Sequence, residues 1–154
     1  MKSTSVKAIL EVSSPAFEHE GLIPKEYSCD GSGDRPELNI GGLPLETKSL
    51  TIIVDDPDAP KGNFTHWLVW NIPPANVIQS NSRPGREGMN SGGSVGYIAP
   101  CPPDGTHRYY FKVYALDTLL DVGKNFNKQT LEQAISGHVV GYGELMGKFS
   151  RNDV

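Results

Sequence analysis

The feature that most constrains the fold is a set of short apolar stretches that alternate with period two. Such alternation is typical of β-strands with one buried face. The clearest stretches are residues 6–12, 49–55, 66–72 and 107–116. Turn sequences such as DPDAPKGN, IPPAN, SRPGREG and PCPPDG separate them, because proline and glycine interrupt regular structure. With 17 glycines and 12 prolines in 154 residues, the chain is predicted to be all-β, a sandwich or a barrel.

One helix is predicted near the C-terminal end. Thr130 and Gln133 fit a capping box, in which each side chain satisfies a free backbone N–H group. Apolar residues and one histidine follow at helical spacing: Leu131, Ala134, Ile135, His138 and Val139. Each glycine in this region weakens a helix by up to about 1 kcal/mol relative to alanine. We therefore expect the helix to depend on packing and to break near Gly141.

Length and charge limit the class of protein. A chain of 154 residues predicts one domain, residues 1–154. Acidic residues outnumber basic ones, 18 to 14, and no basic run marks a nucleic-acid-binding surface. The N-terminal sequence lacks the apolar core of a signal peptide, and no stretch approaches the ~20 apolar residues that span a bilayer. These features predict a cytoplasmic protein with no membrane span.

The two cysteines, Cys29 and Cys101, are expected to be free thiols, because cytosolic thiols are normally kept reduced. Their spacing alone does not exclude a bridge. Neither belongs to a C-x-x-C motif of the kind that binds metal.

Four polar side chains occupy positions where an apolar face is expected. Asp56 follows the strand 49–55 on the side of its apolar residues, and His66 opens the next strand on the predicted face of Leu68. His107 and Tyr109 share a face in the strand 107–116. Each residue taken alone fits a structural role, such as an Asp that caps a turn. Together they predict a pocket, provided that the strands are neighbours.

Three longer blocks resemble the signature sequences of the phosphatidylethanolamine-binding family. They are DPDAP at 56–60, HWLVWN at 66–71 and PCPPDGTHRY at 100–109. The resemblance extends from about Gly21 to Phe149 and is nearest to the bacterial and archaeal branch, often described as Raf kinase inhibitor-like. It implies an antiparallel β-sandwich with a short C-terminal helix.

The resemblance also implies a small cavity for phosphate-type anions. Its lining would be Asp56, His66, Pro102, Pro103, His107 and Tyr109. Asp58 and Pro60 would lie behind this lining. A cis Ala59–Pro60 peptide would orient Asp56 toward the cavity, since a cis bond before proline costs little free energy. A protonated imidazole gives a charge-assisted hydrogen bond to an anionic oxygen. Asp56 would repel that anion, unless it holds a histidine cationic, is itself protonated, or faces the cationic end of a zwitterion.

The favoured function is therefore binding of a small anionic or phosphorylated ligand, with a regulatory role left open. One alternative is an inhibitor or interaction protein acting on a protease or kinase. Another is a hydrolase that uses Asp56, His66 and His107 for acid–base chemistry; against it, no G-x-S-x-G motif is present. Two histidines and an aspartate could also hold zinc, but the resemblance favours an anion, so we expect no metal and no cofactor.

Some segments depart from the family pattern. Residues 34–40 lack the Ser-Pro-Pro and Trp expected of bacterial relatives, and the loops after Pro60 and between Pro103 and His107 are short beside those of animal members. Because these loops border the expected pocket, lipid specificity and kinase regulation are not carried over. The ligand, the protein partner and the oligomeric state, including a homodimer, stay open.

Overall fold

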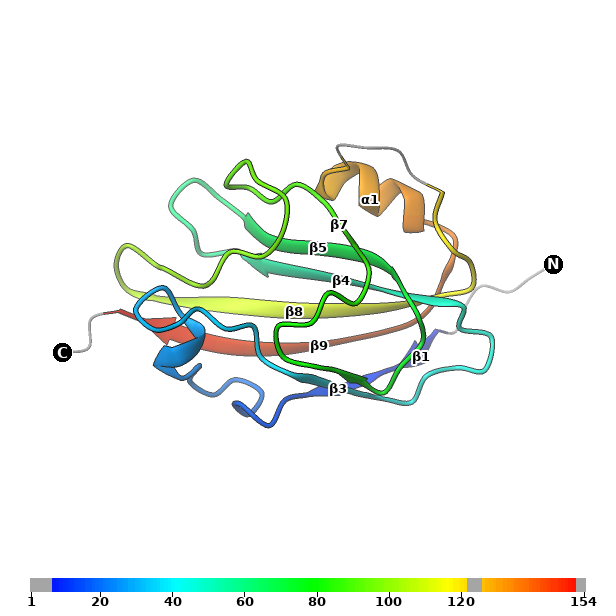
Figure 1. Cartoon of the computed structure of the whole chain (residues 1–154), viewed down its shortest axis with the longest axis horizontal. Coiled ribbons are helices and arrows are strands. Elements are labelled where there is room, and N and C mark those ends of the chain that lie inside the picture. Colours follow the sequence, from blue (N-terminus) through cyan, green and yellow to red (C-terminus); the bar gives the residue numbers. More distant parts are fainter. Residues whose placement is uncertain (1–6, 122–125, 152–154) are drawn as a thin grey trace.

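A computed structural model describes residues 7–121 and 126–151 of the chain. Its strands form two sheets, one of six strands in the order β1-β9-β8-β4-β5-β7 and one of three in the order β2-β3-β6 (Figure 1). In the order of the sheet, the larger one holds Ala8–Ile9 (β1), Val139–Ser150 (β9), Thr106–Leu116 (β8), Ser49–Asp56 (β4), Phe64–Ile72 (β5) and Arg86–Glu87 (β7). The smaller sheet holds Glu11–Ser13 (β2), Leu38–Gly41 (β3) and Val77–Ile78 (β6). A 3-10 turn, Lys25–Tyr27 (η1), and one helix, Lys128–Ile135 (α1), are the helical elements of the described residues.

The predicted strand-rich fold with one short helix is confirmed, but the larger sheet is mixed rather than purely antiparallel. β1 pairs with β9 in parallel, whereas the other pairs of named strands run antiparallel. The parallel pair arises because the stretch predicted as one strand, 6–12, is divided between the two sheets. Between β1 and β2, where the chain passes from the larger sheet to the smaller one, buried Leu10 donates its N–H to the carbonyl of Tyr142 at 2.8 Å. Residue 6 lies outside the described residues.

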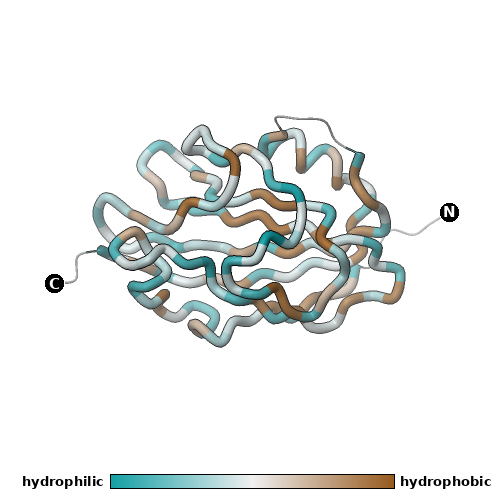
Figure 2. The backbone as a smooth tube through the Cα atoms, viewed as in Figure 1, coloured by the Kyte–Doolittle hydropathy of each residue, from teal (hydrophilic) through white to brown (hydrophobic). Residues whose placement is uncertain are grey.

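Apolar side chains of both sheets belong to one buried cluster. Leu38 and Ile40 of β3 join Ile52 of β4, Val69 of β5 and Phe111 of β8 in it. Figure 2 shows hydrophobic residues along these central strands.

A second buried cluster lies between the sheet and the helix. Leu131 and Ile135 of α1 join Ile53, Leu68 and Trp70 in it. β4 and β5 are therefore covered on both faces, which explains why β4 is buried over its whole length and reads as a nearly continuous apolar run.

The helix begins and ends earlier than its spacing predicts. Asn127, not Thr130, is the N-cap: its side chain accepts the Thr130 N–H at 3.0 Å, and the Thr130 hydroxyl accepts the Asn127 N–H at 2.9 Å. The predicted continuation through Val139 is wrong. Gly137 turns the chain with a φ of +86°, and Val139 starts β9, which pairs with β8 along its length. Strand pairing therefore overrides the helical pattern there.

β5 contains two irregularities that change which side chains share a face. Val54 pairs with Trp67 and Asp55 with Thr65, so β5 holds one extra residue, His66, at this point. A second extra residue lies between Val69 and Ile72, where Asn71 has a φ of +56°. The prediction that His66 lies on the face of Leu68 is therefore wrong, because a bulge changes the direction of the side chains beside it. Leu68 and Trp70 pack under α1, whereas Ile72 belongs to the cluster shared by the sheets.

Candidate functional site

A cavity of about 210 Å³ lies where β4 ends and β5 and β8 begin. It is lined by Asp56, Ala59, Pro60, Phe64, His66, Ile98, Ala99, Cys101, Pro102, Pro103, His107 and Tyr109. The structure thus brings together every side chain that the sequence places in the lining. That these residues bind a ligand stays a prediction.

His107 and Asp56 form a buried pair within this cavity. The Nδ1 atom of His107 lies 2.6 Å from Oδ2 of Asp56, and the two side chains are 8% and 4% exposed. The other carboxylate oxygen, Oδ1, accepts the backbone N–H of Asp58 at 2.8 Å. Because a carboxylate accepts hydrogen bonds, Nδ1 carries the proton, and Nε2 is the ring nitrogen left for a ligand.

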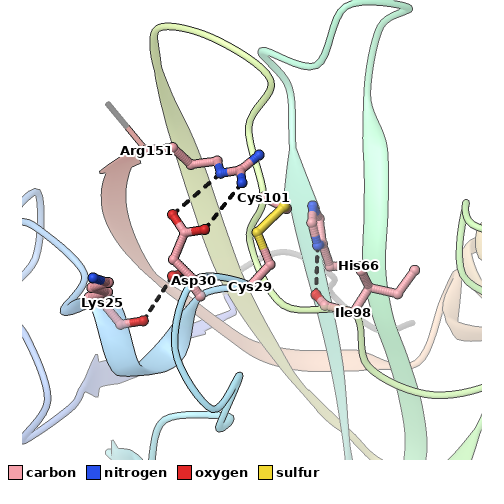
Figure 3. The surroundings of a disulfide bond; sticks show 8 residues. Lys25, Cys29, Asp30, His66, Ile98, Cys101 and Arg151 are labelled. Carbon is pink, nitrogen blue, oxygen red and sulfur yellow. Dashed lines mark hydrogen bonds and ion pairs between the residues drawn. A yellow bond between two sulfur atoms is a disulfide. The ribbon is translucent and has the colours of Figure 1, made fainter. Parts of the chain in front are cut away.

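His66 is held in a similar way by a different group. Its Nδ1 donates to the carbonyl oxygen of Ile98 at 2.7 Å (Figure 3), and the bulge in β5 turns the ring toward the cavity rather than toward α1. Burial lowers the pKa of His66, outweighing the Ile98 hydrogen bond and the Asp56 charge. The ring is therefore neutral near pH 7. The hydrogen bonds of both histidines to the described residues are made by Nδ1, which leaves each Nε2 to the cavity.

Tyr109 lies beside both imidazoles. Its ring centre is 5.3 Å from that of His66 in an edge-on arrangement and 6.3 Å from that of His107 in a stacked one. Burial, and then the Asp56 carboxylate, raise the pKa of Tyr109 well above its usual range. Its hydroxyl therefore stays neutral over the pH range in which proteins work.

Asp58 braces the wall of the cavity by holding the start of β8. Its carboxylate accepts the backbone N–H of Arg108 at 2.9 Å and the guanidinium Nε and Nη2 at 2.8 Å each. The Arg108 hydrogen bonds lower the pKa of Asp58 to about 2. Asp58 thus lies behind the lining, whereas Pro60 is part of the lining itself.

The predicted cis peptide between Ala59 and Pro60 is wrong, because no peptide bond among the described residues is cis. The Ala59 carbonyl accepts the Gly62 N–H at 3.1 Å. This hydrogen bond closes a turn with Pro60 at its second position, where a trans proline fits. Asp56 is instead oriented by its hydrogen bonds to Asp58 and His107.

The expectation of two free thiols is also wrong: Cys29 and Cys101 form a disulfide (Figure 3). The Cys29 N–H donates to the Pro100 carbonyl at 3.0 Å, which brings the two loops side by side with a Cα–Cα distance of 5.3 Å. Such a distance suits a disulfide. The next residue, Asp30, pairs with Arg151 at 3.1 Å. Because Cys101 lines the cavity, the bridge ties one wall of it to the loop that follows η1.

Sequence reasoning missed several residues around the site. Ile98 acts through its backbone carbonyl, so its side chain carries no signal. In the sequence, Asp55 ends an apolar stretch. Its side chain lies on the face of the sheet opposite to that of Asp56, where Lys112 and Lys128 approach it at 3.1 and 2.8 Å. Burial alone would raise the pKa of Asp55, but hydrogen bonds and charge from its neighbours, Lys128 foremost, bring it below its ordinary value. Its position directly before Asp56 was the available signal.

The residues that the structure describes hold neither a metal-binding cluster nor a membrane-spanning helix. Within them, no group of three or more His, Cys, Asp or Glu side chains is arranged to hold a metal ion. The expectation of no bound metal stays a prediction. Across 7–121 and 126–151, no helix is long and apolar enough to cross a membrane.

Comparison with known proteins gives relatives over nearly the whole chain. The model of the family described as phosphatidylethanolamine-binding protein matches residues 13–150. A UPF0098 protein of Archaeoglobus fulgidus is 46% identical over 98% of this chain, which spans only 52% of that protein's length. A UPF0098 protein of Pyrococcus horikoshii is 47% identical over 94% of this chain and 78% of its own length.

Solved structures are similar in fold as well. A phosphatidylethanolamine-binding protein homolog, CT736 of Chlamydia trachomatis, has a TM-score of 0.90 and 38% identity, covering 95% of this chain and 100% of its own. E. coli YbcL, described as a member of the mammalian family, has a TM-score of 0.84 and 26% identity, covering 93% and 99%. With a family model that matches residues 13–150, archaeal relatives in sequence and bacterial relatives in structure, this chain belongs to the phosphatidylethanolamine-binding protein family.

Proposed function

We propose that the chain binds a small phosphate-type anion in the cavity between Asp56, His66, His107 and Tyr109. The observation that carries the proposal is the buried pair of Asp56 and His107, joined at 2.6 Å. A neighbouring carboxylate favours the imidazolium form of a histidine, and that form offers Nε2–H as a charge-assisted donor to an anionic oxygen. The Tyr109 hydroxyl adds a neutral polar group beside it.

The same geometry argues for weak binding. No lysine or arginine is among the described residues that line the cavity, so the positive charge for an anion comes from histidine. The Asp56 carboxylate opposes an anion, although both of its oxygens already accept hydrogen bonds from the protein. Binding should therefore strengthen below neutral pH, where histidine takes up protons.

The test is calorimetry with inorganic phosphate at about pH 6 and about pH 7.5. Wild-type protein should bind more tightly at the lower pH. His107→Gln should lose roughly ten- to a hundredfold in affinity, since a charged donor contributes about 1.5–3 kcal/mol. His138→Gln, an exposed histidine paired with Asp117 outside the cavity, should bind as wild type does. Equal binding by wild type and His107→Gln would contradict the proposal.

A second candidate is hydrolysis, and one observation favours it. A carboxylate that fixes Nδ1–H of a histidine leaves Nε2 oriented as a general base. Incubation with a chromogenic phosphate ester and a chromogenic acetate ester separates the two functions. Turnover that disappears in His107→Gln would favour the hydrolase, whereas binding without turnover favours the ligand-binding protein.

Three wider expectations accompany the proposal. The apolar cluster shared by the two sheets supports a β-sandwich, and the family match over 13–150 supports one domain. A cytoplasmic location stays a prediction, and the disulfide weighs against an ordinary reducing cytosol. Action on a protease or kinase also stays a prediction.

A further inference from the structure

We propose that the cavity selects a phosphate group that still carries a proton, as in a monoester, over a phosphodiester such as a lipid headgroup, and that His66 makes this selection as a hydrogen-bond acceptor. The inference rests on the proposed function, because it concerns the ligand of the same cavity.

The first step is the proton position on His66. Its Nδ1 lies 2.7 Å from the Ile98 carbonyl oxygen, and a carbonyl only accepts hydrogen bonds. Nδ1 must therefore carry the proton. In the neutral ring Nε2 then has a lone pair and no hydrogen, so this nitrogen can accept a hydrogen bond but cannot donate one.

The second step is the charge of His66. The titratable groups around it are Asp55 and Asp56 of β4 and His107 of β8, with Tyr109 packed against its ring. The two carboxylates and the Ile98 carbonyl favour a cationic ring, whereas His107 opposes it. Burial outweighs the favourable contributions, because the side chain is enclosed by Phe64 and Tyr109 and the residue is only 5% exposed. The surroundings of His66 thus favour the neutral form of its ring.

The third step is the contrast with His107. Asp56 is the hydrogen-bond partner of His107, whereas an uncharged carbonyl is the partner of His66. A carboxylate partner lets an imidazole offer Nε2–H as a donor to an anion, whereas Nε2 of His66 can only accept. The cavity consequently holds one donor imidazole and one acceptor imidazole.

The ligand that can form hydrogen bonds with both the donor and the acceptor imidazole is a phosphate with an anionic oxygen and a P–OH group. A diester monoanion has the same charge as a singly protonated monoester, but all its oxygens are acceptors. Bound in the same place, it would set an oxygen against the His66 lone pair and leave Nε2 without a partner. A buried polar group without a partner costs enough to reduce affinity on the order of tenfold or more.

The test compares methyl phosphate with dimethyl phosphate at about pH 6, where roughly half of a monoester carries a proton. Wild-type protein should bind methyl phosphate about tenfold more tightly. In His66→Gln the amide at this position can turn to donate or accept, so the preference should fall to about two- or threefold. His138→Gln should keep the wild-type preference.

The outcomes separate the inference from the proposed function. Equal binding of the two esters by wild type, or tighter binding of the diester, overturns the selection while phosphate binding stands. Binding of neither ester, nor of inorganic phosphate, overturns both. A measurement on wild type covers the case in which His66→Gln does not fold: ¹⁵N spectra of histidine-labelled protein should show Nε2 of His66 without a proton at about pH 6. A protonated Nε2 there would overturn the inference.

Discussion

Single residues in the cavity differ in whether they can change charge near neutral pH. The Tyr109 hydroxyl cannot, because burial and the Asp56 carboxylate raise the pKa of this residue. Histidine is the side chain that changes charge in this range. The pH dependence of binding should therefore come from the histidines and from the protonation of the phosphate itself, with Tyr109 adding a constant contribution.

Tyr109→Phe tests this division of roles. The substitution removes one oxygen and keeps the ring between His66 and His107, so the fold should be retained. A neutral hydrogen bond contributes about 0.5–1.5 kcal/mol, so phosphate affinity should fall roughly two- to tenfold at every pH. Calorimetry at several pH values should give curves of phosphate affinity against pH that run parallel for wild type and variant. A variant whose pH dependence disappears would show that Tyr109 takes part in the titration.

At the scale of elements, the loop of residues 98–103 forms one wall of the cavity and depends on other parts of the chain for its position. Cys101 joins it to Cys29 across a sequence separation of 72 residues, and the Ile98 carbonyl and N–H both bond to His66 of β5. The wall is thus held at both of its ends.

Removal of the disulfide is expected to cost stability. Closing a loop of this length restricts the unfolded chain, and such bridges typically contribute about 2–4 kcal/mol. The double variant Cys29→Ser/Cys101→Ser should therefore unfold at a lower urea concentration than oxidised wild type. Its free energy of unfolding should be lower by about the contribution of the bridge. Reduced wild type provides the matched comparison and should resemble the variant. Two titratable thiols in unreduced native protein would contradict the disulfide itself.

Regular strand pairing decided which elements could be predicted from the sequence. Along β8, alternation places His107, Tyr109 and Phe111 on one face because its pairing with β9 stays in register over these residues. On β5 the extra residue at His66 breaks the alternation, and a bulge leaves no mark in the apolar pattern. The periodicity placed His66 on the face of Leu68, which the pairing contradicts, whereas the motif resemblance placed it in the cavity lining. The disulfide was unpredictable for a related reason, because only the fold brings Cys29 beside Cys101.

For the whole molecule, the covering of β4 and β5 on both faces leaves the ends of the strands as the place for a polar cavity. A second hollow, of about 340 Å³, lies on the other face of the same strands and is lined by Asp55, Pro57, Asn63, Arg108, Tyr110, Lys112 and Glu144. It holds lysine and arginine, whereas the cavity of His66 and His107 does not. Its cations are already paired with carboxylates, Lys112 with Asp55 and Arg108 with Asp58, and Glu144 also lines it. This hollow is therefore a poorer place for an anion than its lysine and arginine suggest.

The most direct measurement is a titration of ¹⁵N-labelled protein with inorganic phosphate at about pH 6, followed by ¹H–¹⁵N spectra. The signals that move should belong to the cavity, with the backbone amides of His66, Ala99 and His107 among them. The signals of Asn63 and Lys112 in the second hollow should move little. Movement confined to Asn63, Lys112 and their neighbours, or no movement at saturating phosphate, would contradict the claim that the cavity between β4, β5 and β8 is the anion site.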